Sequence, residues 1–134
     1  MMYMLDTNIL IHAIRYRPQT LLERLHSHIG GELCISAITY TELIYGVLRS
    51  NRQDQNMKAL QAVLSGIYIL PFDMKAADHA GEVMAYLASR GTPIGDRDAL
   101  IAAHARSLSI VLVTDNTREF VRVPGLTLEN WIDR

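Results

Sequence analysis

The feature that most constrains the fold is an alternation of short apolar runs with longer stretches of helical periodicity. The run IVLVT (110–114) is apolar up to its last residue and mostly β-branched, which is typical of a strand buried on both faces. Strands that alternate with helices form a parallel sheet covered on both sides. We therefore expect an α/β fold. The expected strands are residues 2–5, 32–36, 67–72, 110–114 and 126–132.

Helix start and stop signals occur between these runs. Ser36 and Asp73 stand at N-cap positions, Pro18 stands at a helix start, and Gly91 follows a helix end. The chain contains no internal repeat or linker, so we expect its 134 residues to form one domain, 1–134. The expected helices are residues 8–16, 18–29, 37–50, 52–66, 74–90 and 99–108, with a short helical turn in 115–120.

The composition is that of a globular protein without a membrane span. Apolar residues make up 49% of the chain and charged residues 20%. The N-terminus lacks a basic leader, and the single cysteine, Cys34, cannot form an internal disulfide. We expect a cytoplasmic protein in which Cys34 is a buried, inert thiol. The net charge of −1 gives no general attraction to nucleic acid, although 11 of the 13 basic residues are arginines, which suit local phosphate contacts.

Several acidic side chains and a carboxamide stand near the expected carboxyl ends of the strands. In parallel sheets, binding sites form beyond these strand ends, so we expect the side chains to lie close together. They are Asp6, Glu42, Asp96, Asp98, Asp115 and Asn116, which four separate segments of the chain contribute.

Each of these residues also has a purely structural explanation. Glu42 borders the apolar side of helix 37–50, so it needs a partner, and an ion pair with Arg49 or Arg106 would supply one. Helix capping or the helix dipole would account for Asp6, Asp96, Asp98 and Asn116.

If the carboxylates do converge, their mutual repulsion calls for a cation. The five histidines are scattered, so the sequence does not indicate a zinc site. Carboxylate oxygens are hard ligands that suit Mg²⁺ or Mn²⁺. Such an ion activates water and neutralises charge on phosphate oxygens, so these residues predict metal-dependent hydrolysis of phosphate esters or diesters.

Four sequence blocks cover most of the chain: MLDTNILI (4–11), ISAITYTELIYGVLRS (35–50), GTPIGDRDALIAAHA (91–105) and LVTDNTREF (112–120). Together, in this order, they resemble the motifs of PIN-domain ribonucleases, and more narrowly the VapC toxins of bacterial VapBC toxin–antitoxin systems. The resemblance implies a PIN-like α/β/α sandwich with a mostly parallel central sheet. It also implies a Mg²⁺- or Mn²⁺-dependent endoribonuclease.

The resemblance assigns roles to individual residues. Asp6 and Asp98 match carboxylates that anchor the metal, and Glu42 matches one that positions the ion or orients the attacking water. Asn116 matches the fourth family position, for which Asp115 and Glu119 are alternatives. The implied catalytic residues are Asp6, Glu42, Asp98 and Asn116; the implied metal ligands are Asp6, Glu42 and Asp98; the implied supporting residues are Thr7, Asp96, Asp115 and Glu119.

The same resemblance implies a substrate and partners. VapC toxins cut structured RNA and leave a 5′-phosphate. The stretches GTPIG…IAAHA and REF…PG resemble enterobacterial-looking members of the family most, and this resemblance implies tRNA, including the anticodon loop of initiator tRNA, as the substrate. The implied partners are a VapB-type antitoxin, which places a basic residue among the carboxylates, a second copy of the chain in a homodimer, and DNA through the antitoxin alone. Candidate phosphate contacts are Arg15, Arg17, Arg97 and Arg118.

Three alternative classes fit the residues less well. A receiver domain needs a lysine after a late strand, and neither Lys58 nor Lys75 stands there. A haloacid-dehalogenase-like phosphatase needs a second aspartate where Asn8 stands. The remaining alternative is a non-catalytic PIN-fold module that binds RNA or protein, which we would expect to have lost at least one carboxylate of the set.

Overall fold

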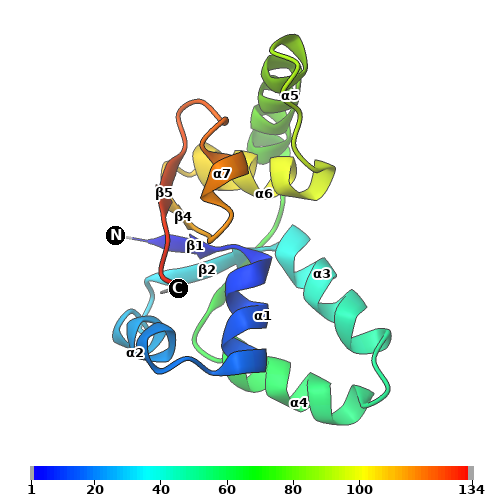
Figure 1. The fold of residues 1–134 in the computed structure, drawn as a ribbon, viewed down its shortest axis with the longest axis vertical. Coiled ribbons are helices and arrows are strands. Elements are labelled where there is room, and N and C mark those ends of the chain that lie inside the picture. The colour runs from blue at the N-terminus through cyan, green and yellow to red at the C-terminus, as the bar shows by residue number, and fades with distance from the viewer. Residues whose placement is uncertain (1, 133–134) are drawn as a thin grey trace.

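A five-stranded sheet forms the centre of the molecule, which the computed structural model describes for residues 2–132 (Figure 1). The strand order is β3-β2-β1-β4-β5, and every neighbouring pair is parallel. No helix within the described residues is both long and apolar enough to cross a membrane. The strands are β1 (Tyr3–Leu5), β2 (Leu33–Ser36), β3 (Tyr68–Leu70), β4 (Val111–Val113) and β5 (Thr127–Glu129). The helices are α1 (Thr7–Tyr16), α2 (Gln19–Ser27), α3 (Ala37–Leu48), α4 (Gln53–Leu64), α5 (Met74–Ser89), α6 (Asp96–Ser107) and α7 (Thr117–Phe120).

Alternate residues of the central strands face two different helical layers, as the two-residue period of a strand requires. Leu5 and Val113 belong to the core shared with α1, α2, α3 and α4. Met4, Cys34 and Leu112 belong to the core shared with α5, α6 and α7. Figure 1 shows α5, α6 and α7 on one side of the sheet and α1, α2 and α4 on the other.

The main expectations for the fold are confirmed. The sheet lies between two helical layers, and within the described residues it is entirely parallel rather than mostly parallel. Ser36 caps α3, because its Oγ accepts a hydrogen bond from the backbone N–H of Ile38 at 3.1 Å. Cys34 is buried as expected, and burial raises the pKa of its thiol to about 12, so the thiolate does not form at neutral pH.

Several expected helix and strand boundaries are wrong. The second helix ends at Ser27, and the chain then turns through Gly30 and Gly31, which both have positive φ. The helix expected at 99–108 begins three residues earlier, at Asp96, because Gly95 is its N-cap. The last strand is limited to Thr127–Glu129, since the following residues leave the sheet and join the α1–α4 core.

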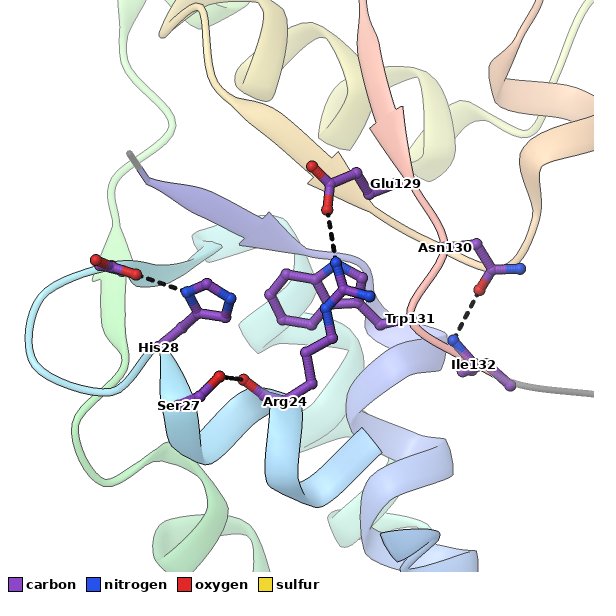
Figure 2. A network of polar contacts seen from close by, with 8 residues as sticks. Arg24, Ser27, His28, Glu129, Asn130, Trp131 and Ile132 are labelled. Carbon is purple, nitrogen blue, oxygen red and sulfur yellow. Dashed lines mark hydrogen bonds and ion pairs between the residues drawn. The ribbon is translucent and has the colours of Figure 1, made fainter. Parts of the chain in front are cut away.

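Residues after β5 are held against α2 by a compact set of contacts (Figure 2). The indole N–H of Trp131 donates to Glu129 Oε1 at 2.9 Å, and Arg24 Nη2 donates to the same oxygen at 3.2 Å. The Arg24 guanidinium lies over the Trp131 ring, 4.8 Å from its centre, and the His28 ring stacks on it with 5.1 Å between centroids. Nδ1 of His28 in turn lies 2.6 Å from Oε1 of Glu32. Residues 130–132 are thereby attached to the α1–α4 side of the sheet.

Candidate active site

Strand β1 runs directly into α1 (Figure 1), and Asp6 is the single residue between them, at the carboxyl end of the strand. Its side chain is buried, with 2% of the residue exposed. Oδ1 accepts a hydrogen bond from the Thr7 N–H at 2.8 Å, and Oδ2 accepts one from the Thr114 hydroxyl at 2.8 Å. The first bond makes Asp6 the N-cap of α1, so the capping explanation is correct as far as it goes. It leaves unexplained why a carboxylate is buried beside other acidic groups.

Glu42 approaches this position from α3. The Thr7 hydroxyl donates to Glu42 Oε1 at 2.6 Å, and the same hydroxyl oxygen lies 3.2 Å from Oγ1 of Thr39. Thr39 stands one helical turn before Glu42, so both side chains lie on the face of α3 that meets α1. One carboxylate oxygen of Glu42 is thus fixed by the residue that directly follows Asp6.

Asp98 stands in the first turn of α6. An open cavity of about 480 Å³ is lined by Glu42, Gly95, Asp96, Arg97 and Asp98. Asp98 is half-buried, whereas Asp96 is exposed at the first residue of the helix. Two segments of the chain therefore bring acidic groups to one hollow, and the buried Asp6 of a third segment lies close enough to feel the charges of Glu42 and Asp98.

The carboxylates are close enough to change each other's acidity. Burial raises the pKa of Asp6 from 3.8 to about 6, and the charges of Asp98 and Glu42 add to this rise against the hydrogen bonds from Thr114 and Thr7. The pKa of Asp98 is also raised, first by burial and then by Glu42 and Glu119, while Arg97 acts in the opposite direction. These carboxylates share a site that favours the arrival of positive charge.

The segment after β4 is connected to the site through hydrogen bonds. Asn116 occupies the N-cap position of α7 without a side-chain capping bond, and its Nδ2 donates to Glu119 Oε2 at 3.1 Å. Its backbone N–H donates to Thr114 Oγ1 at 3.0 Å, which orients the hydroxyl towards Asp6. Asp115 is half-buried between Thr114 and Asn116. Glu119 acts on Asp98 through its charge.

The candidate phosphate-binding arginines occupy different surroundings. Arg97 is 62% exposed at the mouth of the cavity, and its Nη1 lies 3.6 Å from Glu42 Oε2. Arg15 lines a second cavity of about 450 Å³ that Glu42 also borders, between α1, α3 and α4. Arg118 is exposed on α7. Arg17 is the C-cap of α1, about 16.5 Å along the helix from Asp6 at 1.5 Å per residue.

The structural alternatives for the acidic residues hold only in part. Glu42 does pair with an arginine, but the partner is Arg97 rather than Arg49 or Arg106, because the beginning of α6 packs against α3 at this point. Arg49 donates to the Tyr45 hydroxyl, and Arg106 donates to a glutamate of α5. Capping does not explain Asp96 or Asn116 either, since neither side chain makes a capping bond.

Sequence reasoning did not single out Thr39 and Thr114, which are both fully buried and both belong to the site. Thr114 holds Asp6, and Thr39 contacts the hydroxyl that holds Glu42. The sequence does contain a feature that could have identified each threonine as part of the site. Thr114 is the polar end of an apolar strand, and Thr39 lies three residues before Glu42 on the same face of the helix.

The donor set suits a hard divalent cation. Asp6, Glu42 and Asp98 offer carboxylate oxygens, and repulsion among them is what a cation would relieve. Within residues 2–132 no three acidic, histidine or cysteine side chains stand close enough to enclose an ion by themselves. Mg²⁺ does not require such a cage, because it keeps several waters and is held by one or two carboxylates.

Comparison with known proteins identifies the family. The family model of the PIN domain matches residues 3–126. The chain belongs to the PIN-domain family. This PIN domain is 44% identical over 129 residues to the tRNA(fMet)-specific endonuclease VapC of Shigella flexneri, covering 96% of this chain and 97% of the relative. Relatives of this kind place it within the VapC branch of the family.

Solved structures give the same result. The DNA-bound VapBC of Salmonella typhimurium matches this PIN domain with a TM-score of 0.95 and 41% identity, over 98% of this chain and 99% of the other. The VapBC2 of Rickettsia felis, bound to a promoter DNA fragment, matches with a TM-score of 0.94 and 39% identity, over 98% of this chain and 100% of the other. Both neighbours are toxin–antitoxin complexes.

Proposed function

We propose that this PIN domain is the toxin of a type II toxin–antitoxin system and acts as a metal-dependent endoribonuclease. The observation that carries the proposal is the proximity of the buried Asp6 to Glu42 and Asp98, which line one open cavity, in a VapC-family fold. Three carboxylates that repel one another reduce the stability of the protein unless they serve a charged ligand. A bound cation that in turn attracts an RNA phosphate would be such a charged ligand.

In the proposed mechanism, Asp6 and Asp98 hold a Mg²⁺ or Mn²⁺ ion. When bound, the ion supplies an activated water and neutralises the charge that builds on the phosphate oxygens. Glu42 would orient the attacking water, since Thr7 fixes its Oε1 while its Oε2 faces Arg97, which lines the same cavity. Thr114 fixes the carboxylate plane of Asp6, so the site keeps its shape before the substrate arrives. Asn116, Asp96, Asp115 and Glu119 support this arrangement.

The substrate we propose is tRNA, and specifically the anticodon loop of initiator tRNA. The support is the Shigella flexneri relative, which is named for tRNA(fMet) and is 44% identical over nearly the whole chain. An open cavity suits a loop, because its unstacked nucleotides can enter while a duplex cannot. Arg97 at the cavity mouth is the first candidate for a phosphate contact.

The proposed protein partner is a VapB-type antitoxin, since the Salmonella typhimurium and Rickettsia felis neighbours are both VapBC complexes on DNA. DNA binding is attributed to the antitoxin, because this chain has a net charge of −1 and no basic excess of its own. We further propose a homodimer, and a cytoplasmic location that follows from the tRNA substrate.

The proposal is tested with antitoxin-free protein and end-labelled initiator tRNA, with an elongator tRNA as the comparison substrate. We expect cleavage in Mn²⁺ or Mg²⁺, none in EDTA, and a loss of at least about 10³-fold in rate for Asp98→Asn, which removes a metal-holding charge. Asp78→Asn is the matched control, since Asp78 is an exposed carboxylate on α5. Binding of tRNA without cleavage by the wild-type protein would instead establish the non-catalytic binding module.

A further inference from the structure

A buried hydrogen bond joins α6 to the start of α3 away from the cavity. Nδ1 of His104 lies 2.8 Å from Oγ of Ser36, and the two residues are 2% and 0% exposed. The same Ser36 oxygen accepts the backbone N–H of Ile38 that caps α3. One hydroxyl therefore fixes the beginning of α3 and contacts α6 at once.

The surroundings of His104 do not otherwise require an imidazole. Its neighbours along α6 are mostly buried alanines, and its ring meets Phe72 edge-on, with 5.3 Å between centroids. Burial lowers the pKa of His104, against the charge of Asp73, so the ring is neutral at neutral pH. A buried polar ring reduces stability unless it is hydrogen-bonded, whereas an aliphatic side chain would not need Ser36. What the polar pair adds is a defined arrangement of the two helices.

The positions of the two residues show what that arrangement controls. Glu42 lies six residues after Ser36 on α3, and Asp98 lies six residues before His104 on α6. Six residues correspond to about 9 Å of helix. The hydrogen bond is thus a fixed point from which two helical arms of equal length extend towards the two carboxylates. A small slide of α6 against α3 at this point would move Asp98 relative to Glu42 at the cavity.

We propose that His104 is a positioning residue: through its bond to Ser36 it sets the separation of Asp98 and Glu42 for catalysis. The inference rests on the proposed nuclease function and names a residue that touches neither metal nor RNA. Its consequence is a loss of turnover without a loss of RNA binding, because the cavity and the exposed Arg97 that lines it stay in place while the separation of the two carboxylates changes.

The test compares His104→Leu with His104→Asn by single-turnover and steady-state cleavage of tRNA. Leucine removes the hydrogen bond at nearly constant volume, whereas the asparagine amide keeps a polar atom near the position of Nδ1. We expect His104→Leu to lower kcat by about 10- to 100-fold with KM little changed, and His104→Asn to restore most of kcat. Ile101→Val is the stability control, because Ile101 is fully buried in the same helix and makes no polar contact with α3.

The outcomes separate the inference from the proposed function. If the wild-type protein cleaves no RNA, both the proposed nuclease function and the positioning role of His104 are wrong. If the wild-type protein cleaves and His104→Leu keeps its kcat, or loses kcat only as much as an equally destabilised Ile101→Val, the positioning role is wrong. If His104→Leu does not fold, Ser36→Ala removes the same bond from α3, and an unchanged kcat in that variant overturns the inference.

Discussion

Replacing Asp6 by asparagine should make the protein more stable at neutral pH while abolishing RNA cleavage. Asn is close in shape to a protonated carboxyl and is as good an N-cap as Asp, so the bond from the Thr7 N–H can be kept. What is removed is a charge that is buried among other acids. The pKa of Asp6 rises from 3.8 to about 6, and two pKa units correspond to about 3 kcal/mol of free energy.

The pH dependence follows from the direction of this shift. Below about pH 4, Asp6 is protonated in both the folded and the unfolded chain, so its charge has no effect on the free energy of unfolding. As the pH rises from about 4 to about 6, the unfolded chain loses the proton first and becomes relatively more favourable. Stability that is present at low pH is therefore lost as the pH rises through the folded pKa of about 6.

Thermal unfolding in EDTA at about pH 4.5 and about pH 8 measures this effect. We expect the Tm of Asp6→Asn to exceed that of the wild type by roughly 10 °C at the higher pH, which is what about 3 kcal/mol gives in a domain of this size, and by much less at the lower pH. Asp78→Asn, an exposed substitution, should show little change at either pH. An Asp6→Asn protein that is no more stable at pH 8, or that gains equally at both values, would refute the reasoning.

Three further predictions concern the support of the site and the fold. Thr7→Val should lower kcat by about tenfold or more by releasing Glu42 from its 2.6 Å hydrogen bond, and Thr7→Ser should restore it in the same cleavage assay. Mn²⁺ should raise the Tm more at about pH 7.5 than at about pH 5, because protonation of Asp6 competes with the ion; an equal rise at both would contradict this. Trp131→Phe should reduce the free energy of unfolding by about 1 kcal/mol in urea through loss of the bond to Glu129, with cleavage retained.

The sequence predicted the parts of this molecule that depend on one segment or on a general rule of topology. Alternating strands and helices predicted the parallel sheet, and the rule for strand ends predicted that Asp6 and Asp98 approach each other. Their roles in catalysis stay predictions, which the substitutions above address. The helix start at Asp96 was missed because Gly95 caps it without a side chain.

Other features depend on which distant residues meet, and no local pattern specifies that. Arg97 rather than Arg49 faces Glu42 because of the way α6 packs against α3, a relation that becomes visible only when both helices are in place. The support of Asp6 by Thr114 depends on the pairing of β1 with β4 across more than one hundred residues. The Arg97–Glu42 pair and the Thr114–Asp6 hydrogen bond are tertiary contacts, which neither secondary-structure propensity nor a sequence motif specifies.

The attachment of Trp131 to α2 has a practical consequence, because Trp131 is the only tryptophan of the chain. Its intrinsic fluorescence reports on the packing of the α1–α4 layer, to which its ring belongs. Ile101 and the ring of Phe72 that meets His104 belong to the layer on the opposite face of the sheet. A variant in α6 that leaves the emission spectrum unchanged while activity falls has altered one face of the sheet without melting the other. The protein thus carries a built-in optical probe that distinguishes local repositioning from global unfolding.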